Sequence, residues 1–182
     1  ITSTGSCGVY ISGSTTTLNK AGYQQATFTN CTITGATNGV EVKYTDLTLD
    51  GCTVKTTAAA SSYGPSSNGP AASGFAVVST DNAEEGTMPV PAGTIIIKGD
   101  GSYTGPIGLA SLASVKEEYP DFTDDTIKVS GGTFDQAVLK DYCVNEFAPV
   151  KNADGKYEVI KLKVTKWLKL GNDLTMSYSV ES

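Results

Sequence analysis

The sequence repeats a short unit in which two apolar residues alternate with polar ones, a Gly or Asn follows, and another apolar residue comes next. The unit is clearest in residues 126–135, which read TIKVSGGTFD, and residues 26–33, 47–54 and 95–103 align with it. Alternation at period two places both leading apolar residues on one face of a β-strand. The repeat therefore predicts a stack of similar β-strand turns.

Four columns of this alignment match in residue type. Two apolar columns precede the turn: Ala26, Leu47, Ile95 and Ile127, then Phe28, Leu49, Ile97 and Val129. The turn column holds Asn30, Gly51, Gly99 and Gly131, and the apolar column after it holds Ile33, Val54, Tyr103 and Phe134. Gly and Asn enter left-handed backbone at low steric cost, so we expect positive φ, or a site that tolerates Cβ poorly, at each corner.

A second set of short strands precedes these units, in residues 8–11, 39–42, 74–77 and 106–109. The two cysteines of the corner, Cys31 and Cys52, are 21 residues apart (52 − 31). A period of this size built from short strands is typical of a solenoid. We therefore predict an all-β fold, a parallel β-helix of about four rungs, with an antiparallel β-sandwich as the alternative.

The predicted module covers residues 1–160 and closes with a small helical cap and a hairpin. Asp135 is a plausible N-cap for a helix over residues 136–143, which would lay Val138, Leu139 and Tyr142 on the last rung. Residues 152–155, NADG, predict a tight hairpin turn. Residues 55–73 are expected to form a loose loop, and residues 161–182 a linker with the possible start of a following β-domain.

Charge and composition exclude several partners and cofactors. The net charge is −6, and all 13 basic residues are Lys, with no Arg or His. Such a chain is poorly suited to nucleic acid, which requires clustered basic groups. No apolar run is long enough to span a bilayer. The cysteines lack metal-ligand spacing, so we expect neither a zinc site nor another cofactor, and we expect all four thiols to be unpaired. Low charge and abundant Thr favour an exported protein. Because there is no initiator Met and no signal peptide, we expect Ile1 to begin a recombinant or a mature fragment.

Residues 129–134, VSGGTF, followed by a short helix and by residues 148–159, APVKNADGKYEV, resemble the closing unit of repeat-bearing surface proteins of gut bacteria. Proteins of that family carry pectate-lyase-like right-handed β-helices. The resemblance is specific over residues 127–159 and architectural over residues 1–126. It implies a bacterial cell-surface or secreted module, adhesin-like in function, and residues 168–180 resemble the opening strands of a following domain in such proteins.

The alternative function is a polysaccharide lyase or glycoside hydrolase, because β-helices also host these enzymes. Catalysis by a Ser–His or Cys–His pair is impossible without His. Hydrolysis needs two carboxyl groups across a cleft, whereas the outward column Thr29, Asp50, Lys98 and Ser130 offers one acid. Asp50 should instead form a solvated ion pair with Lys98. We therefore predict no enzyme activity and no catalytic residue.

Three insertions, at residues 12–25, 78–94 and 110–126, leave the rungs between the same two strands and should gather along one edge. Their large side chains are candidates for contact with a glycan or a host or surface protein: Tyr23, Met88, Tyr119 and Phe122. The alternative is that these side chains pack the insertions onto the stack. Two acidic clusters, Asp81/Glu84/Glu85 and Asp121/Asp124/Asp125, could hold calcium, but solvated acidic loops fit them better, and we predict no metal site.

Overall fold

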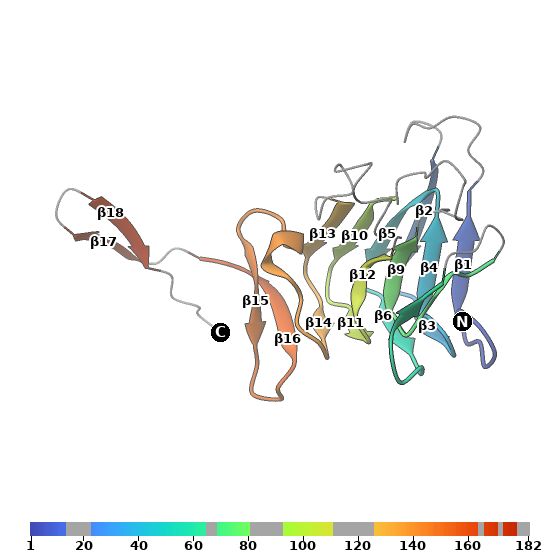
Figure 1. Cartoon of the computed structure of the whole chain (residues 1–182). Coiled ribbons are helices and arrows are strands. Elements are labelled where there is room, and N and C mark those ends of the chain that lie inside the picture. The colour runs from blue at the N-terminus through green and yellow to red at the C-terminus, as the bar shows by residue number, and fades with distance from the viewer. Residues whose placement is uncertain are drawn as a thin grey trace.

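The computed structural model describes residues 1–13, 23–64, 69–80, 93–110 and 126–163, together with the backbone of residues 166–170 and 173–177. The chain is all-β, and no α-helix occurs within these ranges. The structure contains three sheets built mainly from parallel strands, and in each of them the strands stack along one common axis (Figure 1). The predictions that fall on Met88, Tyr119, Phe122, the two acidic clusters and most of the three insertions lie outside the described residues.

Each repeat contributes one strand to each sheet, and we call such a set of three strands a rung. Rung 1 comprises β1 (Val9–Ser12), β2 (Gln24–Thr29) and β3 (Thr32–Gly35), and rung 2 comprises β4 (Val40–Lys43), β5 (Thr45–Asp50) and β6 (Thr53–Thr56). Rung 3 comprises β9 (Val77–Thr80), β10 (Ile95–Lys98) and β11 (Ser102–Thr104), and rung 4 comprises β12 (Ile107–Ala110), β13 (Ile127–Ser130) and β14 (Thr133–Phe134). Sheet 1 has the order β1-β4-β9-β12, sheet 2 the order β2-β5-β10-β13, and sheet 3 begins β3-β6-β11-β14.

The register confirms the apolar columns predicted from the sequence. Leu47 lies opposite both Ala26 and Ile95, and Leu49 lies opposite both Phe28 and Ile97. Val54 pairs in the same way with Ile33 and Tyr103. These strands run parallel, whereas the β-sandwich considered as the alternative requires antiparallel neighbours.

One predicted alignment is wrong by two residues. In sheet 1, Val40 pairs with Val77, not with Phe75 as residues 74–77 had suggested. Gly74 resembles the glycines that open β1 and β4, but it has a φ of 85° and a Cβ there would lie 2.2 Å from the carbonyl oxygen of Ala60. It therefore serves the packing of the preceding loop. Because the shift is two residues, the inward and outward faces are unchanged.

Three of the four predicted corners have positive φ: Asn30 (51°), Gly51 (60°) and Gly99 (72°). In rung 4 the left-handed residue is Gly132, with a φ of 97°, and Gly131 meets the prediction in its other form. Gly131 is still a site where Cβ fits poorly, since such an atom would lie 2.7 Å from the carbonyl oxygen of Gly99. Two adjacent glycines let the left-handed residue move by one position.

The inward columns form one apolar core along the axis of the stack. Leu47, Leu49, Ile95 and Ile97 have no exposed surface, and Tyr103 stacks on Phe134 with ring centroids 4.8 Å apart. All four cysteines are free, with Cys7 and Cys52 buried. The core thus depends on apolar packing between rungs.

The C-terminal cap differs from the predicted helix. Residues 136–143 contain a single 3₁₀ turn, η3 (Lys140–Tyr142), because the backbone at Cys143 and Val144 is extended and pairs with Val129 of β13. Asp135 is not an N-cap, since its Oδ1 accepts a hydrogen bond from the Gly105 N–H at 2.9 Å. Val138 nevertheless packs into the core, whereas Leu139 is exposed.

The predicted hairpin is present as β15 (Phe147–Lys151) and β16 (Tyr157–Lys161), which pair antiparallel with each other. It extends sheet 3 through β16, which pairs antiparallel with β14. Beyond it, β17 (Lys166–Leu170) and β18 (Asp173–Ser177) form a separate two-stranded antiparallel sheet. No helix in the described residues is long and apolar enough to cross a membrane.

Candidate functional site

Sheet 1 is covered on its outer face by residues 57–64 and 69–73, and we call these two stretches the strap. Its short strands β7 (Ser62–Tyr63) and β8 (Ala72–Ser73) pair antiparallel. Ala72 packs with Val78 and Ala110 of the sheet, and Tyr63 and Phe75 flank this cluster. The described part of the strap is therefore an ordered layer, and the expectation of a loose loop is wrong there.

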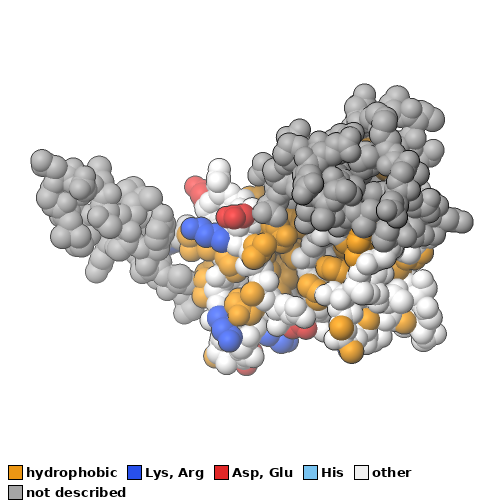
Figure 2. Space-filling view, in the orientation of Figure 1, with side chains coloured by type: hydrophobic (Ala, Val, Ile, Leu, Met, Phe, Trp, Pro, Cys, Tyr) orange, Lys and Arg blue, Asp and Glu red, His pale blue; other side chains and the backbone are white. Residues whose placement is uncertain are grey.

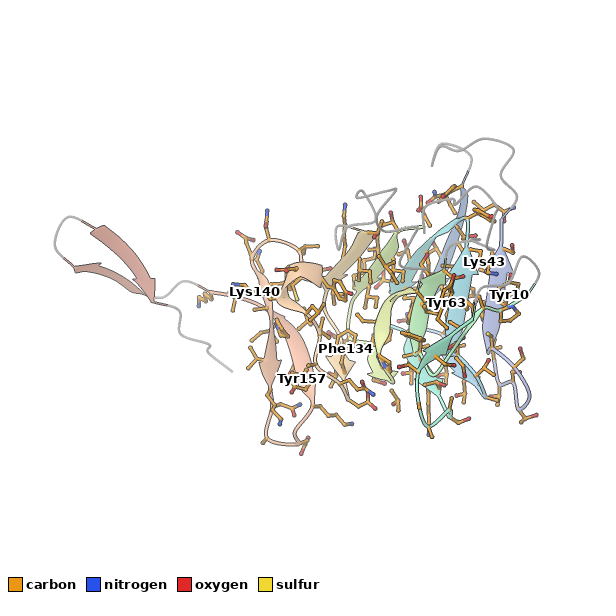
Figure 3. All side chains as sticks on the ribbon, in the orientation of Figure 1. Tyr10, Lys43, Tyr63, Phe134, Lys140 and Tyr157 are labelled. Carbon is orange, nitrogen blue, oxygen red and sulfur yellow. The ribbon has the colours of Figure 1, made fainter. Side chains whose placement is uncertain are left out.

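A polar cluster lies beneath the strap, on the outward columns of sheet 1. Glu41 and Asn38 have no exposed surface, and Lys43 and Thr80 are 1% exposed. Figure 3 shows Tyr10 on β1, Lys43 on β4 and Tyr63 on the strap. A full layer of chain over this face explains how charged side chains on an outward column become buried.

Hydrogen-bond donors surround the Glu41 carboxylate. Oε1 accepts the Ala71 N–H at 2.6 Å and Oε2 accepts Nδ2 of Asn38 at 2.8 Å. Longer contacts come from the Ala72 N–H at 3.4 Å, Thr80 Oγ1 at 3.5 Å and Cys7 Sγ at 3.7 Å. Buried polar groups are tolerated when they are bonded in this way. Glu41 therefore joins the strap to the sheet.

Three neighbours complete the attachment of the strap. The Gly69 carbonyl accepts bonds from Lys43 Nζ at 2.8 Å and from the Tyr10 hydroxyl at 2.9 Å. Asn38 donates to the Ala72 carbonyl at 2.7 Å and accepts the Phe75 N–H at 2.9 Å. The polar atoms of the cluster are thus directed at backbone groups of the strap and of the segment that follows it.

Burial raises the pKa of the Glu41 carboxyl group above its ordinary value. The amides of Ala71 and Ala72, the charge of Lys43 and the bond from Cys7 act in the opposite direction without offsetting desolvation. The pKa of Tyr10 is also raised, chiefly by desolvation. Perturbed acids often mark catalytic sites, but structural networks perturb pKa values as well. The coordination of Glu41 by strap amides favours the structural role.

Two further acids, both on β5, are also engaged. Asp46 accepts the Thr94 N–H at 2.7 Å on one oxygen and Gln25 Nε2 at 2.8 Å on the other. Asp50 pairs with Lys98 at 3.2 Å, with both side chains partly exposed, which confirms the solvated ion pair expected from the sequence. No group of three or more potential metal ligands occurs within the described residues.

Hollows of similar size on the described surface include two that are named here by their place and a third, about 390 Å³, lined by residues 127–128 and 141–145. The corner hollow, about 410 Å³, lies between the strap and the corner that links sheets 3 and 1. Its polar lining includes Thr56, Thr104, Asp135 and Gln136. The hairpin hollow, about 370 Å³, lies between strand β16 and the turns that link sheets 2 and 3 in rungs 3 and 4. Its lining includes Asp100, Glu158 and Lys161. The hairpin hollow brings together two carboxyl groups that the alignment of strands did not relate.

Tyr23 is the one predicted ligand-binding residue that the structure describes. It is 6% exposed and packs edge-on against Tyr44, with ring centroids 6.2 Å apart. Burial also raises its pKa. Little of the ring is left to contact a ligand in this conformation.

Sequence reasoning missed the polar cluster because outward columns of a strand are expected to face solvent. A signal was present, since β9 (Val77–Thr80) begins with two consecutive valines, and continuous apolar residues indicate a strand buried on both faces. On the face seen in Figure 2, the described part of the surface is mostly hydrophobic or uncharged, with few charged side chains. In comparisons with known proteins, no family model, no curated protein and no solved structure matched the chain.

Proposed function

We propose that this chain is a non-catalytic module of a cell-surface or secreted protein, in which the rungs form a right-handed parallel β-helix that binds a glycan or protein or spaces its neighbours apart. Right-handed crossovers are the rule between parallel strands. The register of four rungs and the capping of the stack by β16 support the β-helix. An adhesin-like role in a bacterial protein follows from the sequence resemblance.

The non-catalytic proposal rests on the burial of Glu41 and on its hydrogen bonds to the strap. General acid–base catalysis needs a carboxyl group within hydrogen-bond reach of a substrate. Glu41 instead accepts strap amides and has no exposed surface. Asp46 is committed in a similar way to Thr94 and Gln25. These contacts favour binding or spacing over turnover.

The corner hollow is the described surface that best fits a glycan. Hydroxyl, amide and carboxylate groups gather there, from Thr104, Gln136 and Asp135, and such groups orient polar ligands in shallow sites. Asp135 is held in place by its bond from the Gly105 N–H. Binding in this hollow would be weak, since no described aromatic side chain lines it.

A hydrolase is the second candidate, and the hairpin hollow is the observation that favours it. Asp100 and Glu158 both line this hollow, and glycoside hydrolysis uses two carboxyl groups across a cleft. The same hollow contains Lys161, which pairs with Glu146 at 3.2 Å.

A single experiment separates these proposals. The purified chain is incubated with pectin, alginate and host glycans, with and without calcium, while reducing and unsaturated ends are measured, and a glycan array is probed in parallel. We expect no turnover and at most weak binding, which Gln136→Ala should reduce and Thr27→Ala, an exposed residue on β2 of sheet 2, should not. Turnover that is lost in both Asp100→Asn and Glu158→Gln would replace the binding proposal with the hydrolase.

A further inference from the structure

Two thiols occupy the same column of neighbouring rungs, at the corner that links sheets 2 and 3. The backbone shows the register, since Thr53 N bonds to the Cys31 carbonyl at 2.8 Å and Ser102 N bonds to the Cys52 carbonyl at 3.0 Å. Cys31 is therefore level with Cys52, and Cys52 is level with Gly101 of rung 3. Cys52 belongs to the apolar core, and the half-buried Cys31 packs against that core.

The two sulfur atoms point in the same direction. The Cys31 thiol donates to the Thr29 carbonyl at 3.4 Å, and the Cys52 thiol donates to the equivalent Asp50 carbonyl at 3.5 Å. The Cys52 thiol also lies 3.3 Å from the Phe28 carbonyl of rung 1, which places its sulfur between the two rungs. Side chains in register along a parallel sheet repeat at the strand spacing, so the two sulfur atoms are about 4.8 Å apart.

A buried hydroxyl group without a partner lies beside this column. Tyr103 is 1% exposed, and its hydroxyl has no hydrogen-bond partner among the described residues. A Cβ at Gly101 would lie 3.1 Å from this hydroxyl and closer still to the Cys52 carbonyl oxygen. Because Gly101 has no side chain, the Tyr103 hydroxyl takes the place next to Cys52 in the column. Burial raises the pKa of Tyr103, and the charge of a Cys52 thiolate acts in the same direction, as expected for neighbouring groups.

We propose that Cys31 and Cys52 form a binding site for one soft monovalent metal ion, Cu(I), with the Tyr103 hydroxyl donating a hydrogen bond to the Cys52 sulfur. The ion replaces both thiol protons, so that one Cu⁺ and two thiols give one S–Cu–S unit with a single negative charge and two released protons. The hydroxyl donor offsets part of the cost of burying this charge. This inference does not depend on the proposed binding or spacing function.

The spacing of the sulfur atoms suits an ion that binds two thiolates in line. Metal–thiolate bonds in zinc sites are about 2.3 Å long, so two such bonds span about 4.6 Å. A disulfide instead needs Cβ atoms about 3.5–4.5 Å apart and side chains that turn toward each other. Zinc takes four ligands, whereas this column supplies two thiols and the chain contains no His. Thiolate ligands with a low coordination number select Cu(I).

The test titrates the full chain with Cu(I), supplied as its acetonitrile complex under anaerobic conditions, in competition with a bathocuproine chelator. The two-thiol variant, Cys7→Ser/Cys143→Ser, keeps only the proposed pair of ligands. It should bind one Cu(I) per chain and show thiolate-to-copper charge-transfer absorption in the ultraviolet. Cys31→Ser and Cys52→Ser, each made in that background, should lose both. Copper should also raise the melting temperature of the two-thiol variant, because a site formed by the fold binds the folded chain more tightly than the unfolded one.

The hydroxyl is tested separately, by Tyr103→Phe in the two-thiol background. Loss of a hydrogen-bond partner of a metal ligand typically lowers metal affinity 10–100-fold, so we expect a decrease of about tenfold or more. Tyr157→Phe, on β16, is the matched control and should leave the affinity for Cu(I) unchanged. An unchanged affinity in Tyr103→Phe would overturn the role of the hydroxyl.

Folding of each variant is checked by circular dichroism before titration. If Cys52→Ser does not fold, Cys31→Ser at the half-buried position tests the pair by itself. Equal affinity for Cu(I) in the two-thiol variant and in Cys31→Ser would overturn the inference, and so would a two-thiol variant without the charge-transfer absorption.

Discussion

Replacing Glu41 by Ala should detach the strap from sheet 1. The substitution removes the acceptor of the Ala71 N–H at 2.6 Å and of the longer bonds from Ala72 at 3.4 Å. Asn38 keeps a second acceptor, the Ala72 carbonyl at 2.7 Å. A buried donor left without a partner costs about 1–3 kcal/mol. With the short bonds from Ala71 and Asn38 lost, together with the longer contacts from Ala72, Thr80 and Cys7, we expect a decrease in the free energy of unfolding of about 2–4 kcal/mol.

Urea denaturation followed by circular dichroism measures this change, and amide exchange at Ala71 and Ala72 locates it. Glu158→Ala is the control, because that acid is exposed and should alter stability by less than about 0.5 kcal/mol. Glu41→Gln should have an intermediate effect, since its one carbonyl oxygen can still accept a bond. The attachment of the strap by Glu41 would be refuted if Glu41→Ala matched Glu158→Ala in stability and left exchange at Ala71 unchanged.

Three further outcomes are expected. Leu49→Ala, in the fully buried core, should reduce the free energy of unfolding by about 2–5 kcal/mol in urea titrations. Thr48→Ala, on the outward face of the same strand, should change it little. Equal effects would contradict the assignment of the inward and outward faces of β5. Tyr103→Phe should leave the melting temperature unchanged or raise it, because the buried hydroxyl has no hydrogen-bond partner among the described residues. A clear decrease would contradict this assignment. The pKa of Glu41 is raised in the folded state, so the stability that this group contributes is present below its ordinary pKa of 4.5 and is lost as the pH rises through the pKa of the folded state. Over that pH range, the melting temperature of the parent should fall relative to that of Glu41→Gln. The opposite trend would contradict the direction of the pKa shift.

The rungs could be predicted because their information is local. Alternating apolar residues and a left-handed corner recur in each repeat, so the pairing of Leu49 with Phe28 and Ile97 follows from aligning the columns. The errors arose where a residue with a common local role makes a long-range contact instead. Gly74 packs against Ala60 and does not open a strand, and Asp135 binds the Gly105 amide and does not cap a helix.

The polar cluster could not be predicted because it depends on contacts between distant segments. Glu41 and Ala71 are 30 residues apart, and the strap contains no pattern that specifies the face it covers. From the sequence alone, Glu41 is an outward side chain beside Val40 and Val42, with solvent as the simplest neighbour. The burial of that column follows from the placement of Ala72 against Val78 and Ala110.

The parallel register of the rungs is the claim on which the rest depends, and paired nitroxide labels on β2 and β5 test it most directly. In a background with all four cysteines changed to Ala, two parallel pairs, Gln25/Asp46 and Thr29/Asp50, are replaced by labelled Cys and compared with the crossed pairs Gln25/Asp50 and Thr29/Asp46. The parallel pairs are direct neighbours across the sheet, about 5 Å apart, whereas the crossed pairs are separated by four residues, about 13 Å along the strand. We predict strong dipolar broadening for both parallel pairs and weak broadening for both crossed pairs. Strong broadening in the crossed pairs would contradict the stack of parallel rungs.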